Sequence, residues 1–67
     1  MPVKIRQLKA DLRKAGFDSR PGKGSHVVFR HPLVPALEVT IAGQDGDDAQ
    51  KYQIKEVRNA LKYIKEK

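Results

Sequence analysis

The stretch Pro21-Gly22-Lys23-Gly24-Ser25-His26-Val27-Val28-Phe29-Arg30-His31 decides the fold of this 67-residue chain. It begins with proline and glycine, which favour a turn, and continues with β-branched and aromatic residues, which favour a strand over residues 25–31. Residues 17–20, just before the turn, are a second strand candidate, so the two segments predict a β-hairpin. After Pro32 and Pro35, residues 37–41 alternate apolar and polar side chains, as a half-buried strand does. The sequence therefore predicts three successive strands.

Two amphipathic helices flank these strands. In residues 4–15 the apolar side chains Ile5, Leu8 and Leu12 recur at steps of three and four, and Gly16 follows as a natural C-cap. From residue 50 onward the same spacing relates Ile54, Val57, Leu61 and Ile64. The order α-β-β-β-α predicts an α+β fold, in which a three-stranded antiparallel sheet carries both helices on one face. We expect residues 1–67 to form a single domain.

The other face of the sheet is expected to be open, and strand alternation assigns side chains to it. If Val27 and Phe29 point toward the helices, their neighbours in the same strand point away from them. The outward set predicted for the three strands is Asp18, Arg20, His26, Val28, Arg30, Glu38 and Thr40.

Charge and composition narrow the range of functions. The chain has 14 Lys and Arg against 8 Asp and Glu, a formal charge of +6, and its basic residues gather in residues 1–31 and 51–67. Two basic blocks are typical of an RNA-binding or DNA-binding protein, although solvated helix faces give the same pattern. With no cysteine and no apolar run near the roughly 18 residues of a membrane span, we expect a soluble cytoplasmic protein without membrane contact.

Histidine is the first candidate for proton transfer, because the intrinsic pKa of imidazole, about 6.5, lies in the physiological range. His26 and His31 are five residues apart, so a regular strand places them on opposite faces. His26 follows a glycine-rich turn whose amides suit a phosphate, and we predict that it takes the proton of a ribose 2′-hydroxyl. The charges of Arg20, Lys23 and Arg30 would favour the neutral imidazole and stabilise the phosphate. The alternative is a surface histidine without a role.

Other chemical sites are weaker candidates. The segment 22–25 lacks the spacing of a P-loop and precedes a strand, which argues against nucleotide hydrolysis. Asp18 and Glu38 are expected to pair with Arg20 or Arg30 rather than to ligate a metal, so no metal and no cofactor are predicted. The predicted RNA-binding set is Arg20, Lys23, Gly24, Ser25 and Arg30.

The step Gly16-Phe17, followed by Lys23-Gly24-Ser25-His26 and by Arg30-His31-Pro32, resembles the HicA family of mRNA interferase toxins. The resemblance implies a fold like a double-stranded RNA-binding domain, metal-independent endoribonuclease activity on mRNA, and a catalytic role for His26. It also implies a HicB-type antitoxin as partner, with the toxin monomeric when free and hetero-oligomeric when bound. Two segments differ from the family pattern: residues 42–44 lack a further histidine, and residues 45–48 are acidic rather than Gly-Lys-rich.

Two other functions stay open at this point. The chain could be a non-catalytic module whose open sheet and basic helices bind A-form RNA, and steep salt dependence of RNA binding would support this function. It could instead be an interaction protein whose basic face meets an acidic partner, and failure to bind any RNA at low salt would favour that alternative.

Overall fold

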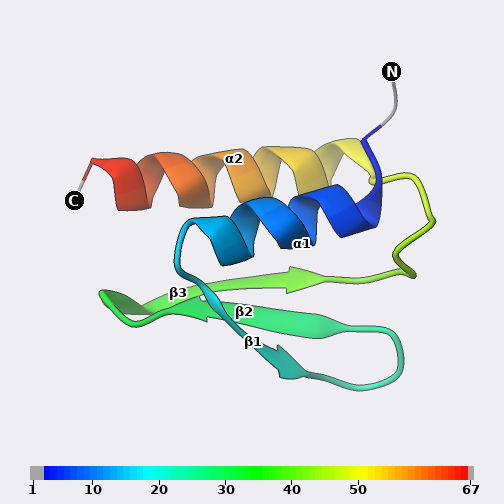
Figure 1. The fold of residues 1–67 in the computed structure, drawn as a ribbon, viewed down its shortest axis with the longest axis horizontal. Coiled ribbons are helices and arrows are strands. Elements are labelled where there is room, and N and C mark those ends of the chain that lie inside the picture. The colour runs from blue at the N-terminus through cyan, green and yellow to red at the C-terminus, as the bar shows by residue number, and fades with distance from the viewer. Residues whose placement is uncertain (1–2, 67) are drawn as a thin grey trace.

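The computed structural model describes residues 3–66 and shows two helices on one face of a three-stranded sheet (Figure 1). The strands are antiparallel, in the order β1-β2-β3. The elements along the chain are α1 Ile5–Lys14, β1 Asp18–Pro21, β2 Val27–His31, β3 Val34–Ile41 and α2 Lys51–Lys65. Neither helix of residues 3–66 is long and apolar enough to cross a membrane. The predicted α+β fold is confirmed, while residues 1, 2 and 67 of the predicted domain lie outside the described residues.

The first turn of α1 is capped by the loop that leads from β3 to α2. The Ile5 N–H donates to the Asp47 carbonyl oxygen at 2.9 Å, and the Arg6 N–H donates to the Asp45 carbonyl oxygen at 3.2 Å. The first N–H groups of a helix have no partner within it, so the loop satisfies two of them. Residues 45–47 therefore stabilise a helix that lies about 40 positions earlier in the chain.

The end of α1 is a Schellman motif, as its glycine predicts. Gly16 has a φ of +97°, the left-handed conformation that glycine adopts without strain. Its N–H donates to the Arg13 carbonyl oxygen, and the Phe17 N–H donates to the Leu12 carbonyl oxygen, both at 3.0 Å. Phe17 and Leu12 are both buried. The turn thus closes the helix and sends the chain into β1 with Phe17 in the core.

The sheet register confirms the predicted assignment of faces. Ser19 pairs with Phe29, and Phe29 with Val39, while Arg30 pairs with Asp18 on one side and Glu38 on the other. Phe29 is fully buried under the helices, whereas Arg30 is exposed on the opposite face. The buried hydrophobic core comprises Ile5, Leu8, Leu12, Phe17, Phe29, Val39, Ile41, Val57 and Ala60.

The strand boundaries differ from the predicted ones at two places. β2 begins at Val27 rather than at residue 25, so Ser25 and His26 belong to the turn. β3 begins at Val34 rather than at residue 37, because the register shifts between Arg30 and His31, which gives β3 additional residues opposite this step. Such a bulge accommodates proline, which has no N–H to donate to the ladder, and Pro35 lies within it.

Helix α2 packs on the sheet through a face that the apolar spacing identified only in part. Val57 is buried, and Ile54, Leu61 and Ile64 pack at the edge of the core. The centre of the face also includes Gln53, which is 2% exposed. Its side-chain oxygen accepts from the backbone N–H at residue 50, and its amide nitrogen donates to the carbonyl oxygen at residue 42. A buried glutamine therefore joins the start of α2 to the end of β3.

Candidate functional site

The turn between β1 and β2 is built on two backbone hydrogen bonds at His26. The His26 N–H donates to the Lys23 carbonyl oxygen at 3.0 Å, and the Gly22 N–H donates to the His26 carbonyl oxygen at 2.8 Å. Gly24 has a φ of +59°, and no heavy atom lies within 4 Å of where its Cβ would be. The turn therefore requires glycine for its backbone conformation and not for space.

The tip of this turn exposes three successive amides. The N–H groups of Lys23, Gly24 and Ser25 donate to no acceptor within residues 3–66, and all three residues are exposed. Successive free N–H groups in a turn form a concavity that binds anions. The Lys23 side chain adds a positive charge at the same place. The turn therefore presents three unpaired amides and one lysine beside His26.

The His26 side chain is exposed, and its ring makes no hydrogen bond or ion pair in the part of the chain that the structure describes. The prediction placed His26 within a strand, and this was wrong, because His26 lies in the turn before β2. Its exposure is nevertheless as predicted. Ser25 and His26 share the turn and are not strand neighbours on opposite faces. Both imidazole nitrogens are free to contact a bound molecule.

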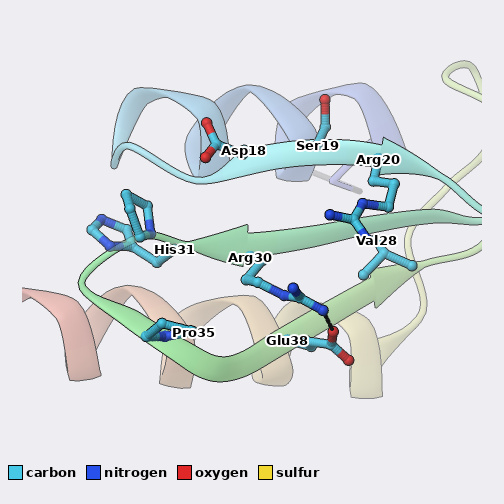
Figure 2. A pocket seen from close by; sticks show the side chains of 9 residues that line it. Asp18, Ser19, Arg20, Val28, Arg30, His31, Pro35 and Glu38 are labelled. Atoms are coloured by element: carbon cyan, nitrogen blue, oxygen red, sulfur yellow. Dashed lines mark hydrogen bonds and ion pairs between the residues drawn. The ribbon is translucent and has the colours of Figure 1, made fainter.

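The open face of the sheet carries the two predicted arginines, in a depression of about 450 Å³. Figure 2 shows Arg20 reaching from β1 over Val28 of β2, and Arg30 reaching from β2 toward Glu38 of β3. An Arg30 guanidinium nitrogen donates to a carboxylate oxygen of Glu38, so these two residues form the predicted ion pair. No ion pair reaches Asp18 or Arg20 within residues 3–66.

The predicted site residues thus fall into two groups. Lys23, Gly24, Ser25 and His26 form the turn, while Arg20 and Arg30 line the depression, which His26 does not line. The lining of the depression contains two arginines and two carboxylates, so its formal charge is balanced. The turn with His26 is therefore separate from the depression that Arg20 and Arg30 line.

His31 lies at the other end of β2 and is buried, with 5% of its surface exposed. Its Nε2 lies 3.0 Å from the Ala15 carbonyl oxygen, and its Nδ1 accepts from the Leu33 N–H at 3.1 Å. Because a carbonyl only accepts and an N–H only donates, these partners assign the neutral tautomer with hydrogen on Nε2. His26 is therefore exposed and His31 buried, and His31 also lines the edge of the depression on the open face.

The structural role of His31 was not predicted from the sequence. The ring packs edge-on against Phe17, with centroids 5.0 Å apart. A Cβ at Gly16 would lie 3.1 Å from Nε2 of His31. The Gly16-Phe17 step and the histidine before Pro32 are therefore parts of one packing unit that joins the end of α1 to β2.

The acidic segment 45–48 pairs with the N-terminal basic block. A carboxylate oxygen of Asp45 accepts from Lys9 at 2.7 Å, and one of Asp48 accepts from Lys4 at 2.6 Å. The hydrogen bond and the charge of Lys9 lower the pKa of the Asp45 carboxyl below its usual value of 3.8. The acidic segment thus neutralises Lys4, at the N-cap of α1, and Lys9, within α1. No three His, Cys, Asp or Glu side chains gather as a metal site within residues 3–66.

Comparison with known families agrees with the resemblance seen in the sequence. Residues 5–65 match the family model described as the HicA toxin of bacterial toxin-antitoxin systems. A search of curated proteins gave no match. The matched range contains both helices, all three strands and the turn with His26. The chain therefore belongs to the HicA toxin family of bacterial toxin-antitoxin systems.

Proposed function

We propose that the protein is a metal-independent endoribonuclease that cleaves mRNA, with His26 as its acid and base. The observation that carries the proposal is an exposed imidazole, free of partners within residues 3–66, directly after three unpaired backbone amides. Membership of a toxin family supports it, because destruction of mRNA is a way to stop growth. Residues 1–67 would act as one catalytic domain.

In the proposed reaction the RNA supplies its own nucleophile. His26 takes the proton of a ribose 2′-hydroxyl, and O2′ forms a bond to the adjacent phosphorus while the bond from phosphorus to O5′ breaks. The products are a 2′,3′-cyclic phosphate and a 5′-hydroxyl, and the leaving O5′ takes a proton from water or from the protonated His26. Proton transfer by a positioned side chain contributes about 10²- to 10⁴-fold to such a rate.

The phosphate contacts are proposed for two places. The amides of Lys23, Gly24 and Ser25, with the Lys23 ammonium, would hold the reacting phosphate and stabilise the charge that builds on it. Arg20 makes no ion pair in the described chain and would bind a neighbouring phosphate. Arg30 already pairs with Glu38, which neutralises its charge, so Arg30 would contribute less to RNA binding than Arg20.

A HicB-type antitoxin is the proposed protein partner, since toxins of this family belong to toxin-antitoxin systems. We propose a monomer when the toxin is free and a hetero-oligomer with the antitoxin, both in the cytoplasm, where mRNA is found. An antitoxin that covers the turn of residues 22–26 would block access to His26. Binding of a pure antitoxin should therefore protect RNA from cleavage.

The test is incubation of the wild-type protein and His26→Ala with a mixed-sequence RNA in EDTA, followed by mapping of the fragment ends. We expect wild type to leave cyclic phosphate or 3′-phosphate ends and His26→Ala to leave the RNA intact. Equal binding of RNA by both proteins without cleavage by either would overturn the nuclease and leave a binding module. Absence of RNA binding at low salt would leave an interaction protein.

A further inference from the structure

The outer face of α2 carries a stripe of basic residues outside the candidate site. At 100° per residue, five cations fall within an arc of about 80° around the helix axis, opposite the buried face of α2. All five are exposed. We call them the basic stripe, and its members are Lys51, Lys55, Arg58, Lys62 and Lys65.

The cations of the basic stripe have no carboxylate partners. None of them makes an ion pair within residues 3–66, and Glu56 and Glu66, the acidic residues of the C-terminal segment, lie outside the 80° arc. By contrast, Lys4 at the N-cap of α1 and Lys9 within α1 are paired with the acidic segment 45–48. The outer face of α2 therefore carries five cations without ion pairs, while Arg6, Arg13 and Lys14 on α1 are also without ion pairs in the described chain.

Helix stability does not account for this arrangement. Like charges three and four residues apart on a helix repel each other, and every successive pair in the basic stripe has this spacing. Lys51 lies in the first turn of α2, which contains no acidic residue, although the helix dipole favours negative charge there. Only Lys62 and Lys65, in the last turn, are placed as the dipole favours. The stripe therefore destabilises the start of α2, which indicates a role in binding rather than in folding.

From this pattern we propose that the basic stripe is a binding site for the phosphodiester backbone of RNA, in addition to the turn around His26. The inference rests on the proposed ribonuclease function and extends it to a second surface. Lysine is depleted in the cores of protein interfaces, which are rich in aromatic and apolar anchors, whereas nucleic-acid interfaces are strongly positive. Four of the five stripe residues are lysine, the fifth is arginine, and none is aromatic. An RNA strand fits this chemistry better than a protein.

The dimensions of the stripe agree with a strand of nucleic acid. Fourteen residues of helix separate Lys51 from Lys65, or roughly 21 Å at 1.5 Å per residue. A nucleic-acid strand aligned with the stripe places several phosphates along this length. A groove of about 360 Å³ runs beside the first half of the stripe, with Lys51, Lys55 and Arg58 among the residues that line it.

The orientation of α2 relates the stripe to His26. The first turn of α2 and the turn between β1 and β2 lie at the same end of the long axis of the molecule (Figure 1). The C-terminus of α2 and the turn between β2 and β3 lie at the other end. A strand that binds along the stripe therefore leaves it, past Lys51, at the end where His26 lies. The stripe would hold RNA on the helical side while the turn cuts it.

The experiment measures binding of the full-length wild-type chain to a 2′-O-methyl RNA, which lacks the nucleophilic hydroxyl and stays intact. The stripe variant is Lys55→Gln/Lys62→Gln, and the control is Arg6→Gln/Lys14→Gln, which removes the same charge from exposed positions of α1. At about 0.7 log units per contact, two lost contacts reduce the salt slope by about 1.4 and the affinity at 0.1 M salt by about 25-fold. We expect the control to lose less than about threefold.

Four results would overturn the proposal. Equal losses in the stripe variant and the control would show a dependence on net charge alone. Unchanged RNA binding by the stripe variant, together with weaker binding of a pure HicB-type antitoxin, would make the stripe a protein interface. If the stripe variant binds RNA as wild type does and wild type still cleaves RNA, the nuclease stands without the stripe. If wild type neither binds nor cleaves RNA, the proposed function fails as well.

Discussion

The two ends of β2 carry the two histidines of the chain, in opposite environments. His26, just before the strand, is exposed and its ring has no partner within residues 3–66. His31, the last residue of the strand, is buried and both of its ring nitrogens are hydrogen-bonded. An imidazole with both nitrogens occupied by backbone groups cannot exchange a proton without losing a contact. The same side chain therefore serves packing at one end of the strand and is available for chemistry at the other.

The largest stability effect is expected at His31. His31→Ala removes the partners of the Ala15 carbonyl and the Leu33 N–H and leaves a cavity beside Phe17, for a loss of about 3 kcal/mol in the free energy of unfolding. A domain of this length has about 3–10 kcal/mol in total. Urea unfolding measures the loss. His31→Asn, which can keep an acceptor for the Leu33 N–H, should lose less, and a fully stable His31→Ala would contradict the structural role.

Two of the three glycines with positive φ in residues 3–66 give the next comparison, since Gly16 lies against His31 and Gly24 precedes His26. Gly16→Ala combines backbone strain with a Cβ 3.1 Å from His31 Nε2, and we expect a loss of about 2 kcal/mol or more. Gly24→Ala meets open space, and the backbone strain alone costs about 1 kcal/mol.

Thermal unfolding of both variants tests this order. Combining Gly16→Ala with His31→Ala should cost less than the sum of the two changes, because removal of the ring relieves the contact. Strict additivity would show that the crowding has no effect on stability. Gly24→Ala should also slow RNA cleavage, because it alters the amides beside His26.

The fold was largely predictable from the sequence, because hydrophobic periodicity and turn residues both have local causes. Apolar residues at steps of three and four predicted α1, and Gly16 predicted its C-terminal end. The predicted start of β2 was wrong, because residues 22–26 form a tight turn closed by the hydrogen bond from the Gly22 N–H to the His26 carbonyl oxygen. Strand propensity does not reveal such a turn. The bulge in β3 and the burial of Gln53 depend on contacts distant in the chain.

The site was predictable to a lesser extent. The exposure of His26 and the pair formed by Arg30 and Glu38 follow from alternation along the strands, and both are as predicted. The separation of Lys23 from the arginines of the open face was not foreseen, because alternation fixes a face and not a position along it. The role of His31 depends on Ala15, sixteen residues away, and no local pattern indicates such a contact.

The smallest effect on stability is expected at Asp45, which is distant in the chain from both histidines. A change there tests whether RNA cleavage depends on residues outside the two ends of β2. Lys9 lowers the pKa of the folded Asp45 carboxyl below that of the unfolded chain, so the ionised form contributes stability at neutral pH. This contribution is lost as the pH falls through the lowered pKa. Asp45→Asn should therefore reduce the urea midpoint slightly at pH 7 and not at pH 2, with RNA cleavage at pH 7 unchanged.

The most direct test of the difference between the two ends of β2 is the rate of RNA cleavage by His26→Ala, with and without free imidazole, beside its urea unfolding curve. We predict at least a 100-fold loss of rate, a free energy of unfolding within about 0.5 kcal/mol of wild type, and partial recovery of cleavage when imidazole is added. Cleavage by His26→Ala at the wild-type rate would contradict the assignment of His26 as acid and base.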